Sequence, residues 1–153
     1  MENHKACIEA LNDLVQINND RIAGYQRALG ELKDGQDLDL KSLFNDLIAQ
    51  SSAFKSELEE MIQSYGGDPA EGTTMAGKLY RGWMDVKAMF SGEDRATALK
   101  NCEAGEDAAQ KAYQMALDDE EVMPQTKDLI RRQKEQLREA HDRVKQLRDL
   151  AAS

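Results

Sequence analysis

The chain has 153 residues, of which 41% are hydrophobic, only 5% are aromatic and two are proline. This length suits one domain with a substantial core, and this composition favours helices. The formal net charge of −9 argues against a nucleic-acid-binding protein, because phosphate contacts need a clustered basic surface. Since no apolar run approaches the ~20 residues that span a bilayer, we expect no membrane-spanning protein. The sequence predicts a single all-α domain over residues 1–153.

Cysteine usage and the N-terminal stretch bear on the compartment. Cys7 and Cys102 stand far apart and form no metal-binding spacing. The stretch MENHKACIEAL lacks the basic region and apolar core of a signal peptide. Isolated cysteines without a disulfide framework are typical of a reducing environment. We therefore expect a cytoplasmic protein.

Apolar residues that recur at spacings of three and four predict four long helices. The first spans Asn3–Lys33, and the second starts at Asp37 or Asp39 and ends at Tyr65, before Gly66, Gly67 and Pro69. The third follows Ser91–Asp94 and runs to Leu117, and the last begins at Pro124. A shorter helix, Thr73–Phe90, rises ~27 Å at 1.5 Å per residue, enough to return the chain from one end of a bundle to the other.

Each long helix carries a polar residue at the centre of its apolar stripe. These residues are Asn18, Ser51, Glu106 and Gln133. Of these, Glu106 most needs a partner in the core, because burial of an unpaired carboxylate costs several kcal/mol. On a helical wheel Asp20 lies nearly opposite the stripe of the first helix, so we expect it to face solvent.

Aligned by their midpoints, the helices place these residues at a similar depth, which predicts a shared polar layer. Buried polar groups are normally hydrogen-bonded. We therefore expect Glu106 to be buried and bonded to Gln133, to Asn18 or to the hydroxyl of Tyr25 or Tyr113. Such a layer fixes helix register without any cofactor.

A metal site is the alternative reading of Glu106. Di-iron helical bundles use a Glu from each of two helices and a Glu-x-x-His from each of the other two. This sequence has no Glu-x-x-His and offers only Glu103, Glu106 and His141, too few inward ligands for two iron ions. The alternative is thus a weak iron or manganese site. The only other histidine, His4, stands near the terminus, and we find no catalytic constellation.

Three stretches carry a family resemblance: GGDPAEGTTMAGKLYRGWMDVK, CEAGEDAAQKAYQMAL and RRQKEQLREAHDRVKQL. With them the chain resembles an uncharacterised bacterial four-helix-bundle family, a domain of unknown function of the ferritin-like superfamily. The resemblance implies a ferritin-like bundle with a helical crossover, Thr73–Phe90, between the second and third long helices, and no assigned activity. Glu103, Glu106, Tyr113 and His141 match the family pattern. Members often have a histidine where this chain has Tyr80.

The sequence thus favours a non-enzymatic helical-bundle protein with a structural or protein-interaction role. Its partner is an unknown protein or a second copy, and a stress-associated role is a further hypothesis. Apolar residues on or beside the crossover helix either pack on the bundle or form a dimer interface; they are Met75, Leu79, Met84, Met89 and Phe90. The alternative is a ferritin-like metal-binding oxidase or metal-storage protein with a degenerate site. A small-ligand site near Trp83 and Tyr113 is left open.

Overall fold

A computed structural model describes residues 4–31, 38–70 and 95–152. Within these ranges the regular structure consists of four helices: α1 (His4–Glu31), α2 (Leu38–Ser64), α4 (Arg95–Asp118) and α5 (Pro124–Ala152). The prediction of an all-α fold with four long helices is confirmed. The predicted crossover helix, Thr73–Phe90, and the apolar residues assigned to it lie outside the described residues.

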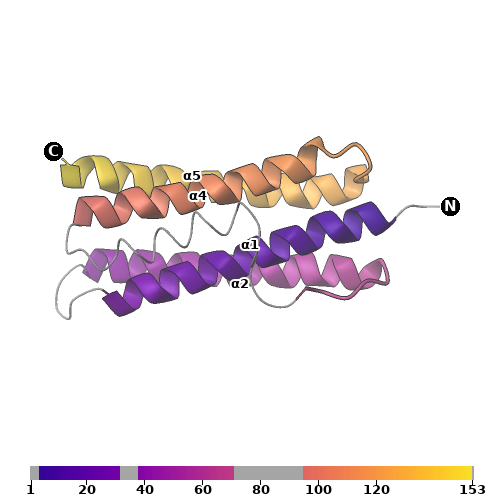
Figure 1. Cartoon of the computed structure of the whole chain (residues 1–153), viewed down its shortest axis with the longest axis horizontal. Helices are drawn as coiled ribbons and strands as arrows, with labels where there is room; N and C mark the ends of the chain where they lie inside the picture. Colours follow the sequence, from indigo (N-terminus) through magenta and orange to yellow (C-terminus); the bar gives the residue numbers. More distant parts are fainter. Residues whose placement is uncertain (1–3, 32–37, 71–94, 153) are drawn as a thin grey trace.

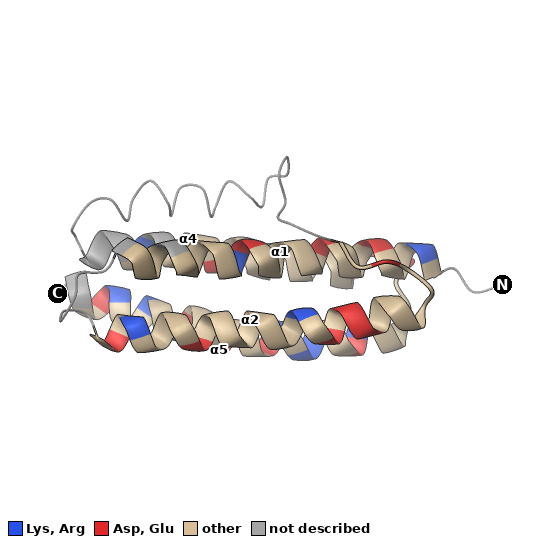
Figure 2. Cartoon of the chain, turned by 90° about the horizontal axis from the view of Figure 1, so that it is seen from below, with Lys and Arg blue, Asp and Glu red and all other residues tan. Residues whose placement is uncertain are grey.

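The four helices lie side by side, with α1 antiparallel to α2, α4 antiparallel to α5, and the consecutive helices α2 and α4 running in the same direction (Figure 1). The most extensive contacts are those of α1 with α2 and of α4 with α5, so the bundle is built from two helical hairpins. Contacts of α1 with α4 and of α2 with α5 close the ring of neighbours. Charged residues of both signs lie along the helices (Figure 2). None of the described helices is long and apolar enough to cross a membrane.

The apolar stripes of all four helices meet in one core. Each helix contributes fully buried leucine, isoleucine, valine or aromatic side chains, as the three-and-four spacing requires. Examples are Leu11, Leu14 and Tyr25 of α1, Leu43, Phe44 and Leu58 of α2, Leu99 and Tyr113 of α4, and Ile130, Leu137 and Val144 of α5. Pro124 is the first residue of α5, where its missing N–H costs no helical hydrogen bond.

Gly66 ends α2 in the left-handed conformation that glycine adopts without steric cost, with φ of 83°. The N–H of Gly67 donates to the carbonyl of Ile62, and that of Gly66 to the carbonyl of Gln63, which is the hydrogen-bond pattern of a Schellman cap. Beyond the cap, the chain is fastened to α1: the Asn12 side chain donates to the Asp68 carbonyl at 3.1 Å and accepts from the N–H of Ala70 at 2.6 Å.

The expectation that Asp20 faces solvent is wrong: its side chain is only 1% exposed. The expectation assumed one buried stripe on α1, whereas α1 packs against both α2 and α4. Its second buried face consists mainly of small residues, with Ala6, Ala10, Ile17 and Ala28 on the same side as Asp20. A helix between two neighbours buries polar positions that a single-stripe pattern places outside.

Candidate functional site

Glu106 lies midway along α4 with its side chain fully buried. Its Oε1 accepts two hydrogen bonds from α1, one from the hydroxyl of Tyr25 at 2.6 Å and one from Nε of Arg21 at 2.9 Å. The contact with Arg21 is an ion pair between side chains that are 1% and 0% exposed. Glu106 is thus a charge neutralised inside the bundle by a guanidinium from the other hairpin.

Arg21 is the largest fully buried side chain of the described residues and extends the cluster to a third helix. Its Nη1 donates to the hydroxyl of Ser51 on α2 at 2.8 Å, and its guanidinium lies 5.8 Å from the centre of the Tyr25 ring. Sequence reasoning missed this residue. The spacing held a signal for it, because Arg21 follows Asn18 by three residues and precedes Tyr25 by four, which places all three on one helical face.

A second chain of hydrogen bonds crosses the core beside this pair. Asn18 of α1 donates from Nδ2 to the Leu14 carbonyl at 2.8 Å and to the Tyr113 hydroxyl of α4 at 2.9 Å. Tyr113 in turn donates to Oε1 of Gln133 on α5 at 2.7 Å. The amide of Gln133 donates to α2, at 3.2 Å to the Phe54 carbonyl and at 3.1 Å to Oε1 of Glu57.

We call these seven residues the polar layer: Asn18, Arg21, Tyr25, Ser51, Glu106, Tyr113 and Gln133. Among the partners expected for Glu106, the structure places Tyr25 on it. Asn18 and Gln133 instead meet at Tyr113, and the hydrogen bonds of these described side chains include none between them and Glu106. Ser51 reaches Glu106 only through Arg21. The layer links all four helices through side chains, with most of its bonds running between the two hairpins.

Burial sets the protonation of the groups around Glu106. Burial raises the pKa of the Tyr25 hydroxyl well above its ordinary value, and the negative charge of Glu106 raises it further. The pKa of the Cys102 thiol, one turn before Glu106 on α4, is raised for the same two reasons. Burial also raises the pKa of the Tyr113 hydroxyl. All three groups therefore stay protonated at neutral pH, and both tyrosines serve as hydrogen-bond donors.

The three residues considered for a metal are not brought together around one point. His141 of α5 contacts α4 at the surface, with Nε2 at 2.7 Å from Oδ1 of Asp107 and 3.8 Å from Oε2 of Glu103. Glu103 also pairs with Arg148, whereas Glu106 pairs with Arg21. Within the part of the chain that the structure describes, no three His, Cys, Asp or Glu side chains are arranged to hold a metal ion.

A comparison with family models matches residues 6–119 to a domain of unknown function, DUF2383. The chain belongs to this family. No curated protein matches the chain. The DUF2383 match contains six members of the polar layer, all but Gln133. It also ends before α5, so His141 and Arg148 lie outside the matched region.

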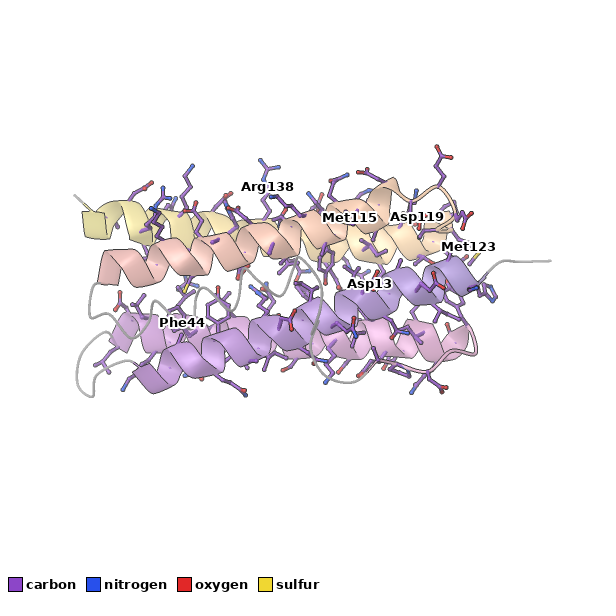
Figure 3. All side chains as sticks on the ribbon, viewed as in Figure 1. Asp13, Phe44, Met115, Asp119, Met123 and Arg138 are labelled. Atoms are coloured by element: carbon purple, nitrogen blue, oxygen red, sulfur yellow. The ribbon has the colours of Figure 1, made fainter. Side chains whose placement is uncertain are left out.

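The DUF2383 region also holds a hollow on the surface between α1 and α4. Four alanines line it, together with Met115 and three carboxylates: Ala6, Glu9, Ala10, Asp13, Ala112, Met115, Ala116 and Asp119. Its volume is about 190 Å³. Asp13, Met115 and Asp119 lie around it in Figure 3, and the Met115 side chain is 68% exposed. Burial, and then the neighbouring charge of Glu9, raise the pKa of Asp13.

Proposed function

We propose that this DUF2383 protein is a non-enzymatic helical bundle of the ferritin-like type that works as a structural or protein-interaction module. The observation that carries the proposal is the buried ion pair between Arg21 and Glu106. In the bundle core, where ferritin-like proteins build metal sites from inward carboxylates and histidines, this chain pairs a carboxylate with a guanidinium. The central polar residues are thereby bound to each other.

The composition of the polar layer supports a structural role. A di-iron site gathers several inward carboxylates and histidines, because hard cations need anionic oxygen ligands. The layer contains one carboxylate, and a cation placed at Glu106 would meet the positive charge of Arg21, whose Nε is 2.9 Å away. The network of amide, hydroxyl and ionic bonds instead fixes the register of the two hairpins.

The surface supports the interaction role. Met115, a large apolar side chain that is 68% exposed, lines the hollow together with four alanines. Exposed apolar surface rimmed by charged residues is characteristic of interaction sites.

We place the protein in the cytoplasm, since Cys7 and Cys102 are both free thiols. Self-association and a separate protein partner are both consistent with this role.

Metal analysis separates the proposal from the alternative of a metal-binding oxidase or storage protein. The protein is expressed in medium supplemented with iron and manganese, and bound metal is measured for the wild type, Glu106→Gln and Glu103→Gln. We expect no stoichiometric metal in any of the three. Stoichiometric iron or manganese that Glu106→Gln abolishes would overturn the structural role of the layer.

Site-specific photo-crosslinking in cells tests the interaction role. A photoreactive residue replaces Met115 in one variant and Leu150, which is similarly exposed at 70%, in a matched control. We expect a discrete crosslinked species from position 115 and none from position 150. Absence of a product at position 115, or equal products at both positions, would contradict an interaction through this face.

A further inference from the structure

The ion pair at the centre of the bundle has two polar atoms that make no hydrogen bond within the described part of the chain. Glu106 Oε2 and Arg21 Nη2 are both buried, and neither atom has a hydrogen-bond partner among the residues that the structure describes. An unsatisfied buried donor or acceptor costs ~1–3 kcal/mol, and more when the group is charged. Such atoms in a native core call for a partner.

The geometry of a guanidinium points Nη2 towards the Glu106 carboxylate. Nε and Nη2 form one edge of the Arg21 side chain, and their N–H bonds point in parallel. Nε donates to Oε1 of Glu106 at 2.9 Å, so the N–H of Nη2 that is parallel to it also points towards the Glu106 carboxylate. In a bidentate pair Nη2 would donate to Oε2 directly. Here the second bond is not made, while Nη1 is held on the opposite edge by Ser51 at 2.8 Å.

The chemistry of the two atoms selects what can bridge them. Nη2 needs an acceptor and Oε2 needs a donor, so the bridging group must do both. A cation would meet the Arg21 charge and an anion the Glu106 charge, whereas a neutral molecule avoids both penalties. The geometry points to a single buried water that accepts from Nη2 and donates to Oε2, a binding site between α1 and α4.

Such a water becomes part of the contact between the hairpins. Its two partners come from different hairpins, and both side chains are at most 1% exposed. Exchange with bulk solvent therefore requires α1 and α4 to separate locally. The lifetime of the water then measures how often the bundle opens at the polar layer.

A crystal structure of the wild-type protein at a resolution that locates waters tests the inference directly. We expect one water within hydrogen-bond distance of both Nη2 of Arg21 and Oε2 of Glu106. A direct bond between Nη2 and Oε2, or a pair with no water between its free atoms, would overturn it.

A solution measurement provides the second test. Magnetic relaxation dispersion of the solvent counts long-lived internal waters in the wild type, in the double variant Arg21→Met/Glu106→Leu and in Tyr65→Phe. The control removes a hydroxyl that is only partly buried, at the end of α2. We expect the double variant to lose one long-lived water and the control to keep it. Equal counts in the wild type and the double variant would contradict the site, and if the double variant does not fold, the wild-type crystal structure decides.

Discussion

Arg21 of α1 and Glu106 of α4 form an ion pair across 2.9 Å, and neither side chain is more than 1% exposed. The two residues belong to different hairpins and are 85 positions apart in the chain. Moving two charges from water into the core is expensive, and the pair is tolerated because each charge neutralises the other and further bonds come from Tyr25 and Ser51. We therefore expect the pair to specify how the hairpins fit together more than it stabilises them.

Removal of one member of the pair should destabilise the bundle strongly. Glu106→Leu leaves a buried guanidinium without its counter-charge, and Arg21→Met leaves a buried carboxylate. We expect each single variant to lose about 3–5 kcal/mol of unfolding free energy. Urea denaturation followed by circular dichroism measures the loss.

The double variant Arg21→Met/Glu106→Leu is the matched control for these two. An apolar pair of similar volume removes both charges, and such replacements are often neutral or stabilising by ~1–4 kcal/mol. We expect the double variant to recover most of the stability that either single variant loses. Additive losses would show that the side chains act independently, against the role given to the ion pair.

Much of the helix pattern could be predicted from the sequence, because burial imposes a period of 3.6 residues on each stripe. Glu106, Asn18, Ser51 and Gln133 stand out as polar residues within such stripes, and all four are buried. Their connections could not be predicted. Which hydroxyl reaches Glu106 depends on the rotation of each helix and on its depth in the bundle, and neither is encoded in the spacing of one helix.

Arg21 and Asp20 show a second limit. The pattern of a single stripe puts Asp20 on the solvent side of α1, and it does not single out Arg21, a residue type that is rarely fully buried. Yet Arg21 has the spacing of the stripe, and Asp20 lies on a second face that contains the small residues Ala6, Ala10 and Ala28. A run of alanines at helical spacing indicates a second packed face. Polar residues on that face are therefore candidates for burial, as are those on the first face.

The hydroxyl of Tyr113 should contribute more to stability than that of a partly buried tyrosine with similar bonding. Tyr113→Phe removes the hydroxyl that Asn18 and Gln133 share and leaves Oε1 of Gln133 buried without a donor. We expect a loss of about 1–3 kcal/mol. The control is Tyr65→Phe, whose hydroxyl bonds to Thr126 at 2.6 Å near the end of α2 and is only partly buried, with an expected loss of ~1 kcal/mol. Chemical denaturation of both variants compares them, and equal losses would argue against a special role for the layer.

Stability should decline at alkaline pH. The pKa values of Cys102, Tyr25 and Tyr113 are raised in the folded protein above ordinary values of 9.0 for cysteine and 10.0 for tyrosine. Below pH 9 both states hold these protons, so their contribution is complete. Above it the unfolded chain releases protons that the folded protein retains, and the unfolding free energy falls by up to ~1.4 kcal/mol per pH unit for each group.

Cys102→Ala separates the thiol from the tyrosines. Above pH 9 the unfolded cysteine ionises before the tyrosines do, so this variant should show a shallower decline between pH 9 and 10, and at higher pH its slope should stay below that of the wild type by the share of one group. Urea titrations at several pH values give both slopes. A stability that is flat from pH 8 to 11 in the wild type would contradict the assigned shifts.

Asp13, at the hollow between α1 and α4, should be a mildly destabilising charge. Burial and the charge of Glu9 raise its pKa above 3.8, so the folded state binds this proton more tightly than the unfolded chain. Its stabilising contribution is therefore present only at low pH and is lost as pH rises through the folded pKa. We expect Asp13→Asn to unfold at a higher urea concentration at pH 7, with the gain shrinking as pH falls towards 3.8. A gain that persists unchanged at acidic pH would indicate another cause.

Replacement by alanine should have different effects at three glycines near the ends of α1 and α2: Gly30, Gly66 and Gly67. A Cβ on Gly67 would lie 2.9 Å from the side chain of Ile8 and 3.1 Å from that of Ile62, so Gly67→Ala crowds the cap of α2 against α1 and should cost about 1–3 kcal/mol. At Gly66 the space is open but φ is 83°, and alanine there should cost ~1–2 kcal/mol through backbone strain alone. Gly30 has neither constraint, and Gly30→Ala should stabilise the helix by ~0.4–1 kcal/mol. Thermal denaturation ranks the three variants, and a Gly67→Ala protein as stable as the wild type would show that Ile8 moves aside without cost.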